Sequence, residues 1–229
     1  MAVYAGPNLT ETGLIFYYDI SNKKSYPGTG TGWFDLSGNN FTASLINGTT
    51  FSNGNLTFDG SNDYVLVGND AKYNGLTGDF TLDIWWRTSN PSKTLNYVIS
   101  NARDCCGTYN GFDIMCFGPV SKFLFAWWNG TSSQWYSNTV IAANTWYNLA
   151  VSFSGTVANC YINGAFDVQK TSLVLGSPAS YNLALGGMGA FPSVYTLVGN
   201  LNVAKMYNRA LSASEILDNY NSMRGRFNL

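Results

Sequence analysis

Short segments in which apolar and polar residues alternate recur along the whole chain. Between residues 80 and 87, Phe80, Leu82, Ile84 and Trp86 occupy every second position. A period of two is the spacing of side chains on one face of a β-strand, so this pattern predicts a strand. The same pattern, or a short apolar and aromatic run, predicts strands at residues 14–18, 55–58, 64–67, 80–87, 97–100, 112–117, 122–128, 135–141, 146–153, 159–162, 183–185 and 199–207.

The segments between these strands carry residues that suit tight turns. Asp-Gly or Asn-Gly pairs occur at 59–60, 129–130 and 163–164, and both pairs tolerate the positive φ that hairpins need. With 24 Gly, 16% aromatic and only 11% charged residues, the composition is typical of many short strands joined by turns. No Pro-rich or Ser-rich linker divides the chain. The sequence therefore predicts an N-terminal arm at residues 1–12 and one all-β domain at residues 13–229.

One helix is predicted, close to the C-terminal end of the sequence. Ser212 and Glu215 have the spacing of a capping box, in which each side chain bonds the backbone N–H of the other residue. Ile216, Leu217 and Tyr220 then form a short apolar stripe. A stripe this short is typical of a helix that docks on its own domain, so we expect this helix to pack against the sandwich.

Charge and hydropathy exclude several classes of partner. The formal net charge is −1 and the 12 Lys and Arg residues are scattered, so the basic stripe of a nucleic-acid-binding protein is absent. No apolar run approaches the ~20 residues that cross a bilayer, so membrane insertion is not expected. The first residues lack the basic and apolar regions of a secretory signal, which predicts synthesis and retention in the cytoplasm. We expect the four cysteines to be mainly reduced: Cys105, Cys106, Cys116 and Cys160.

Four motifs, in the same order along the chain, resemble the laminin-G-like branch of the concanavalin-A-like lectin and glucanase superfamily. The first is residues 13–19 (GLIFYYD) followed by 33–39 (WFDLSGN), and the second is residues 56–65 (LTFDGSNDYV). The third is residues 146–151 (WYNLAV) with 161–164 (YING), and the fourth and most specific is residues 199–212 (GNLNVAKMYNRALS). The resemblance implies a two-sheet antiparallel jelly-roll sandwich with a short C-terminal helix, but no particular ligand, because one fold hosts many functions.

The tail, residues 215–227 (EILDNYNSMRGRF), resembles the ends of such domains in structural proteins of tailed phages, notably those that infect marine cyanobacteria. This resemblance implies a virion protein made in the host cytoplasm, such as a capsid decoration, head or tail fibre, or appendage. We expect it to contact other virion proteins or copies of itself in a symmetric assembly, and to adhere to surface glycans. A free carbohydrate-binding lectin is the alternative, and a glycoside hydrolase is third.

The residues argue against catalysis. Glycoside hydrolysis generally needs two carboxylates on either side of the bond, and glucanases of this fold place Glu residues close together on one strand. This chain has only two Glu, Glu11 and Glu215, and neither lies in a predicted strand. Histidine is absent, which removes the usual general base and the Ser-His and Cys-His nucleophile systems. We therefore predict a protein that is not an enzyme.

Aromatic residues in the segments 123–129 and 134–136 are candidates for glycan or partner binding, because flat rings suit the apolar faces of sugars. Trp127 and Trp128 are adjacent on one strand and must face opposite sides, so one of them fills the core. The predicted surface patch consists of Asp104, Trp128, Asn129, Trp135 and Tyr136.

The resemblance also implies a structural calcium ion near the first strand and the last motif. Calcium prefers oxygen ligands from side chains and backbone carbonyls. Asp19 and Asn202 occupy the matching positions, and Asn22 is a further candidate ligand. Relatives usually carry an acidic residue where this chain has Asn202, which reduces the negative charge available, and turn capping is the alternative role for these residues.

Overall fold

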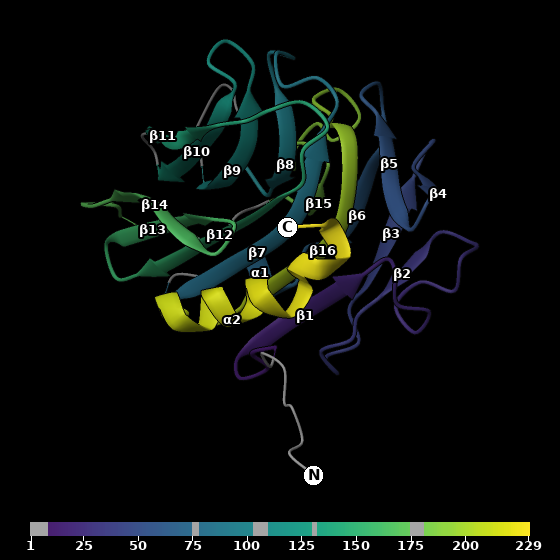
Figure 1. The fold of residues 1–229 in the computed structure, drawn as a ribbon, viewed down its shortest axis with the longest axis horizontal. Helices are drawn as coiled ribbons and strands as arrows, with labels where there is room; N and C mark the ends of the chain where they lie inside the picture. Colours follow the sequence, from purple (N-terminus) through teal and green to yellow (C-terminus); the bar gives the residue numbers. More distant parts are fainter. Residues whose placement is uncertain (1–8, 75–77, 103–109, 130–131, 175–180) are drawn as a thin grey trace.

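Two antiparallel β-sheets lie face to face in the computed structural model (Figure 1). The structure describes residues 9–74, 78–102, 110–129, 132–174 and 181–229. Sheet A has the strand order β14-β13-β12-β7-β16-β5-β4, and β1 also pairs with β16. Its strands are β1 (Leu14–Asp19), β4 (Thr50–Ser52), β5 (Asn55–Asp59), β7 (Phe80–Thr88), β12 (Tyr147–Ser154), β13 (Val157–Ile162), β14 (Ala165–Lys170) and β16 (Val198–Tyr207).

Sheet B has the order β11-β10-β9-β8-β15-β6-β3-β2. Its strands are β2 (Gly32–Phe34), β3 (Thr42–Ile46), β6 (Tyr64–Gly68), β8 (Asn96–Ser100), β9 (Asn110–Phe117), β10 (Lys122–Asn129), β11 (Ser132–Val140) and β15 (Leu183–Leu185). The helices are α1 (Ala71–Asn74), α2 (Ala213–Met223) and the 3-10 helix η1 (Arg224–Phe227). The predicted all-β, two-sheet sandwich with a short C-terminal helix is confirmed.

Every strand predicted from the sequence is present, with boundaries that differ by a few residues. Four strands were not predicted, and all four lie at or next to the edge of a sheet: β2, β3, β4 and β14. β2 and β4 contain only three residues each, and β14 has no buried residue, so none of the three carries the apolar repeat of a buried strand.

Alternation along each strand sends one set of side chains into the space between the sheets. On β7, Leu82, Ile84 and Trp86 point there, and all are at most 1% exposed. Large aromatic rings fill much of this core, and Phe80 stacks on Phe153 with ring centroids 4.3 Å apart. Burial of these rings is the main driving force for closing the sandwich.

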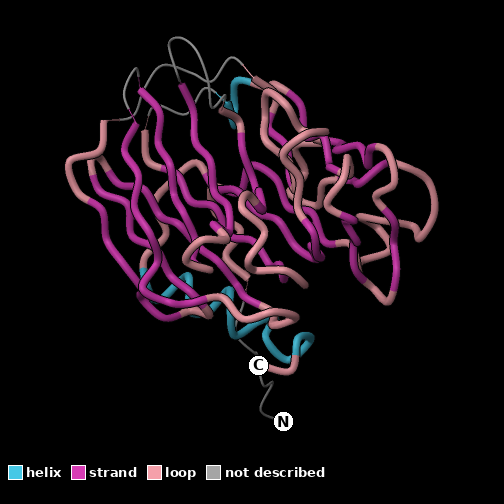
Figure 2. The backbone as a smooth tube through the Cα atoms, turned by 90° about the horizontal axis from the view of Figure 1, so that it is seen from above, coloured by secondary structure: helices cyan, strands magenta, loops and turns pink. Residues whose placement is uncertain are grey.

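Helix α2 and η1 cover the outer face of sheet A (Figure 2). Trp85, which alternation places on that face, stacks on Phe227 of η1 at 4.1 Å and on Tyr220 of α2 at 5.7 Å. The polar residues beside Trp85 are therefore buried rather than solvated. Asp83 is 2% exposed and its carboxylate pairs with Lys205 Nζ, which is 2.8 Å away and fully buried.

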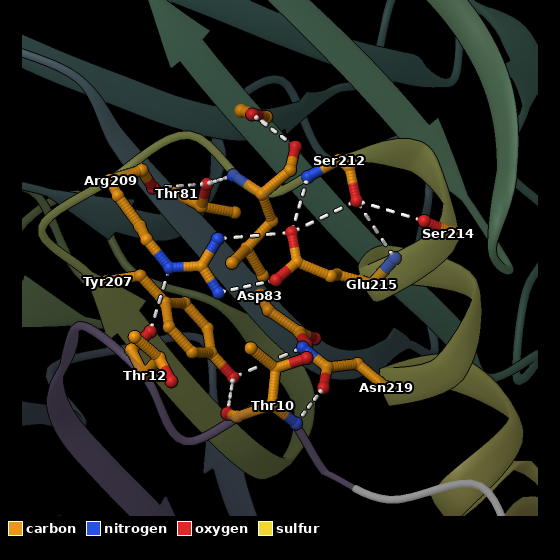
Figure 3. A network of polar contacts seen from close by, with 12 residues as sticks. Thr10, Thr12, Thr81, Asp83, Tyr207, Arg209, Ser212, Ser214, Glu215 and Asn219 are labelled. Atoms are coloured by element: carbon orange, nitrogen blue, oxygen red, sulfur yellow. Dashed lines mark hydrogen bonds and ion pairs between the residues drawn. The ribbon is translucent and has the colours of Figure 1, made fainter.

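The capping box at the start of α2 is confirmed. The Ser212 hydroxyl accepts the N–H of Glu215, and the Glu215 carboxylate accepts the N–H of Ser212 (Figure 3). Arg209 also pairs with Glu215, and its guanidinium lowers the pKa of that carboxyl to about 2. Farther along α2, the Asn219 side-chain oxygen accepts the N–H of Thr10, which ties the N-terminal segment to the helix.

Side chains and a turn cover parts of the free edges of the sheets. The turn at residues 35–39, after β2, lies beside β1: Asp35 accepts the N–H of Tyr17, and the Ser37 hydroxyl donates to the carbonyl of Ile15. On the opposite side of the sandwich, the Asp167 carboxylate of β14 accepts the N–H groups of Asn138 and Thr139 on β11, which joins the edges of the two sheets. These contacts occupy backbone groups that would otherwise be open to another strand.

Among the described residues, no helix is long and apolar enough to cross a membrane. Cys116 and Cys160 are free thiols in the core, and burial raises the pKa of each to about 12. A buried thiol with so high a pKa is protonated at neutral pH and unreactive. Cys105 and Cys106 lie outside the described residues.

Candidate functional site

The outer face of sheet B carries a shallow aromatic and aliphatic hollow of about 150 Å³, which we call the β8–β11 platform. Four neighbouring strands contribute one to three side chains each. The platform is lined by Leu95, which precedes β8, and by Tyr97 from β8, Met115 and Phe117 from β9, Leu124, Ala126 and Trp128 from β10, and Gln134 and Tyr136 from β11.

Alternation on β10 explains why this face is apolar although it lies outside the sandwich. Phe123, Phe125 and Trp127 point into the core, and Trp128 therefore points to the platform. Cross-strand pairing places Leu124 between Met115 and Tyr136, and Ala126 between Asp113 and Gln134. The small side chain of Ala126 lies between bulkier neighbours, and this size difference creates the hollow.

A buried carboxylate fixes the orientation of the Trp128 ring. Trp128 Nε1 donates to Asp113 Oδ2 at 2.7 Å, and the Ser100 hydroxyl donates to the other oxygen of Asp113. Asp113 is 1% exposed, so this bond is shielded from water and holds the indole plane in one position. A ring that is already immobilised loses little entropy when a ligand stacks on it.

Tyr136 is the most accessible ring of the platform, with 41% of its surface exposed. Its ring centroid lies 5.9 Å from that of Phe117, so it rests on a neighbour from another strand. The lining contains no charged side chain, and its polar groups are the Tyr97 and Tyr136 hydroxyls and the Gln134 amide. Rings beside a few hydrogen-bonding groups suit a ligand with apolar faces and hydroxyl edges.

Two other hollows adjoin β1, of about 420 Å³ and 390 Å³. Leu14 lines both of them, and Lys72 and Lys24 contribute to one each. They are larger than the platform, but the only aromatic side chain in their linings is Tyr17. The arrangement of several rings on adjacent strands is therefore a feature of the platform.

The structure brings together two of the five residues of the predicted surface patch, Trp128 and Tyr136. The inclusion of Trp135 was wrong: its ring points into the core and stacks on Phe125 at 5.4 Å. Asn129 lines a separate hollow at the end of the sandwich with Trp127 and does not belong to the platform. Asp104 lies outside the described residues.

Sequence reasoning missed the residues that complete the platform, above all Asp113, Tyr97 and Met115. The signal was present in part, because Asp113 and Met115 alternate with the core residues Phe112 and Ile114 along β9. An aspartate inside such an apolar strand needs a buried partner. Nothing in the sequence shows that the partner is Trp128, which pairs with a different residue of β9, Gly111.

The predicted calcium ligands do not form an open oxygen cage. Arg226 from η1 lies on them: Nη1 is 2.8 Å from Asp19 Oδ1 and 3.0 Å from Asn202 Oδ1, and Nη2 is 3.0 Å from Asp19 Oδ2. Asn22 accepts the N–H of Lys24 within its own turn. Among the described residues no group of three or more His, Cys, Asp or Glu side chains could hold a metal. The residues at this position therefore do not fit a calcium ion.

Both glutamates lie outside the strands, as predicted from the sequence. Glu215 is held in the cap of α2 by Ser212 and Arg209, and its low pKa makes it a poor proton donor. Glu11 borders one of the hollows beside β1. Neither residue lines the β8–β11 platform.

A family model described as the concanavalin A-like lectin/glucanases superfamily matches residues 59–217, well over half of the chain. No curated protein matches the sequence. Among solved structures, a Trypanosoma rangeli sialidase in complex with sialic acid is similar, with a TM-score of 0.74 and 15% identity over 98% of this chain and 35% of the sialidase chain.

The binding domain of Paraclostridial Mosquitocidal Protein 1 is also similar, with a TM-score of 0.68 and 18% identity over 93% of this chain and 52% of that chain. The chain therefore spans about a third of the first structure and about half of the second. At these identities the likeness establishes a shared fold.

Proposed function

Because the chain belongs to the concanavalin A-like lectin/glucanases superfamily, we propose that it is a non-catalytic carbohydrate-binding module whose sugar-contacting surface is the β8–β11 platform. The observation that carries this proposal is that one hollow is lined both by the immobilised Trp128 ring, which is 8% exposed, and by the exposed Tyr136 ring of the next strand. A sugar ring presents an apolar face to such a pair, while its hydroxyls reach the Tyr136 hydroxyl and the Gln134 amide.

The two structural neighbours support a binding role without identifying the ligand. One of them holds sialic acid and the other is named as a binding domain. Both share only the fold with this chain, so the argument depends on the platform itself.

The absence of catalysis is part of the proposal. Glu215 is held by Arg209 and Ser212, and Asp113 lies almost fully buried beneath Trp128. A hydrolase would need a second carboxylate across the scissile bond from the first. We therefore expect no turnover of laminarin, agar or related polysaccharides, and release of reducing sugar that disappears on replacing one Asp would contradict this expectation.

The test of binding is a glycan array that contains neutral and sialylated sugars, followed by calorimetry with the best glycan. Tyr136→Ala removes the exposed ring and should weaken binding about tenfold, or about 1.4 kcal/mol. Phe166→Ala is the matched control, because Phe166 is also an exposed aromatic (59%) but lies on β14 of sheet A. Binding that is unchanged in Tyr136→Ala, or a wild-type protein that binds no glycan, would contradict the proposal.

A second proposal concerns where the module acts. We propose that it is part of a virion, in contact with other virion proteins or with copies of itself, as the resemblance of the tail implies. Support comes from the surface, which has few charges and exposes large apolar side chains such as Phe34, Phe51 and Phe166. Mass spectrometry of purified particles tests this proposal. A stable monomer that binds glycans and is absent from particles would favour the free lectin.

A further inference from the structure

The carboxylate of Asp19 is buried at the end of β1, and the guanidinium of Arg226 is its cationic partner. Asp19 is 2% exposed, and both of its oxygens are bonded to Arg226 at 2.8 and 3.0 Å. The remaining donors to Asp19 are neutral: the N–H of Ser21 and the hydroxyl of Tyr17. A carboxylate this deeply buried needs a positive charge beside it, and Arg226 supplies that charge.

The same guanidinium also binds the second residue of the predicted calcium site. Arg226 Nη1 donates to Asn202 Oδ1 at 3.0 Å, so the two side-chain groups expected to coordinate a metal both face one arginine. Asn202 Nδ2 donates to the carbonyl of Gly54, to Asn55 Oδ1 and to the Ser21 hydroxyl, and this fixes the direction of Asn202 Oδ1. These contacts orient the Asn202 side chain so that its oxygen faces the cationic guanidinium of Arg226.

Neighbouring contacts hold Arg226 in this position. Phe227, the next residue, stacks on Trp85 at 4.1 Å and contacts the tilted Trp146 ring at 4.8 Å, so η1 is anchored to the outer face of sheet A. The two N–H arms of a guanidinium match the two oxygens of a carboxylate, and the group keeps its positive charge at every physiological pH. The position is therefore occupied by a permanent cation that belongs to the chain.

We propose that Arg226 replaces the structural calcium ion in this protein, so that its stability does not depend on divalent cations, and that the oxygens of Asp19 and Asn202 form a latent site that accepts a divalent cation only when the guanidinium is removed. Calcium and the guanidinium would need the same oxygens, so their occupancies exclude each other. One carboxylate and one amide oxygen form a weak site, so the affinity exposed by removing Arg226 should be in the millimolar range.

Thermal unfolding in 5 mM calcium chloride and in 5 mM EDTA tests the proposal. We expect the wild-type Tm to be the same in both solutions to within about 1 °C. Arg226→Ala leaves a buried carboxylate without a cation and should lower the Tm by roughly 5 °C in EDTA, and calcium should restore part of that loss. Magnesium, which demands a tighter octahedral shell, should restore less.

Two further variants separate the charge of Arg226 from a general effect of changing η1. Arg224→Ala is the matched control, because Arg224 is exposed on the same short helix, and we expect no calcium-dependent change in its Tm. Arg226→Lys keeps the charge, so it should remain insensitive to calcium even if it is less stable. A wild-type protein that EDTA destabilises, or an Arg226→Ala variant whose Tm calcium does not raise, would overturn the proposal.

Discussion

The ion pair between Lys205 and Asp83 gives the most direct test of how α2 is held on sheet A. The two residues face each other across β16 and β7, and the Lys205 ammonium is fully buried. Asp83 accepts three bonds: from Lys205 Nζ at 2.8 Å, from Asn148 Nδ2 at 2.6 Å and from Asn219 Nδ2 of α2 at 3.2 Å. The carboxylate is thus the centre of a network that joins three strands and the helix.

Lys205→Met removes the cation but leaves the shape of the side chain nearly unchanged. The Asp83 carboxylate keeps two amide donors and loses its counter-charge, so we expect a cost of about 3–5 kcal/mol in the free energy of unfolding. At roughly 2–4 °C per kcal/mol for a chain of this size, the Tm should fall by about 6–20 °C. Loss of the contact between the ammonium and the Tyr17 ring, 5.9 Å away, adds a smaller part.

The double variant Asp83→Leu/Lys205→Met separates the free energy contributed by the ion pair from that contributed by the surrounding residues. Replacing both charges removes the uncompensated carboxylate and leaves the Asn148 amide without its Asp83 acceptor, while the Asn219 amide keeps the Tyr207 hydroxyl, so it should cost less than Lys205→Met alone. Urea unfolding followed by tryptophan fluorescence measures all three variants, with Asp83→Leu completing the cycle. A cost below about 1 kcal/mol for Lys205→Met, or a coupling energy near zero, would refute this account of the network.

Two further predictions concern the cap of α2 and a close backbone contact. Arg209 lowers the folded pKa of Glu215 from 4.5 to about 2, so Glu215 stabilises the fold fully above pH 4.5 and this contribution is lost as the pH falls through 2. Glu215→Gln should lower the free energy of unfolding by about 0.5–1 kcal/mol at pH 7, and the difference from wild type should vanish near pH 2. Denaturant titrations at each pH measure this difference, and a difference that does not change with pH would contradict the prediction. Gly199→Ala would place a Cβ 2.1 Å from the Arg87 carbonyl oxygen, so we expect a loss of about 3 kcal/mol or more by urea unfolding, and a loss below about 1 kcal/mol would show that the strands separate easily there.

The parts of the fold that follow from local rules could be predicted from the sequence. Alternation correctly placed Trp127 and Trp128 on opposite faces of β10, because a strand allows no other arrangement. The capping box at Ser212 and Glu215 was likewise local, since both partners lie within one turn of the helix. The family resemblance then supplied the arrangement of the strands in two antiparallel sheets, which no local pattern contains.

The parts of the site that depend on distant residues could not be predicted. Alternation also separates the neighbouring rings of Trp135 and Tyr136, but the other residues of β11 are mostly polar, so no apolar repeat indicates which of the two rings faces the core. The contact of Arg226 with Asp19 joins residues 207 positions apart. Arginine is ordinarily a solvated side chain, and Arg226 remains 36% exposed; only the docking of η1 against Trp85 brings its guanidinium onto Asp19.

The covered edges of the two sheets restrict how copies of this chain can associate. The turn at residues 35–39 lies beside β1, Asp167 joins β14 to β11, and the edge strands β2 and β4 contain three residues each. A sheet that continues from one molecule into the next needs a long, unpaired backbone edge. β2 and β4 are too short to supply one, and the contact of Asp167 with Asn138 and Thr139 interrupts the outer edge of β11. We therefore expect an ordered array of this protein to rely mainly on side-chain contacts, with a spacing set by the shape of the sandwich rather than by the 4.7–4.9 Å repeat of paired strands.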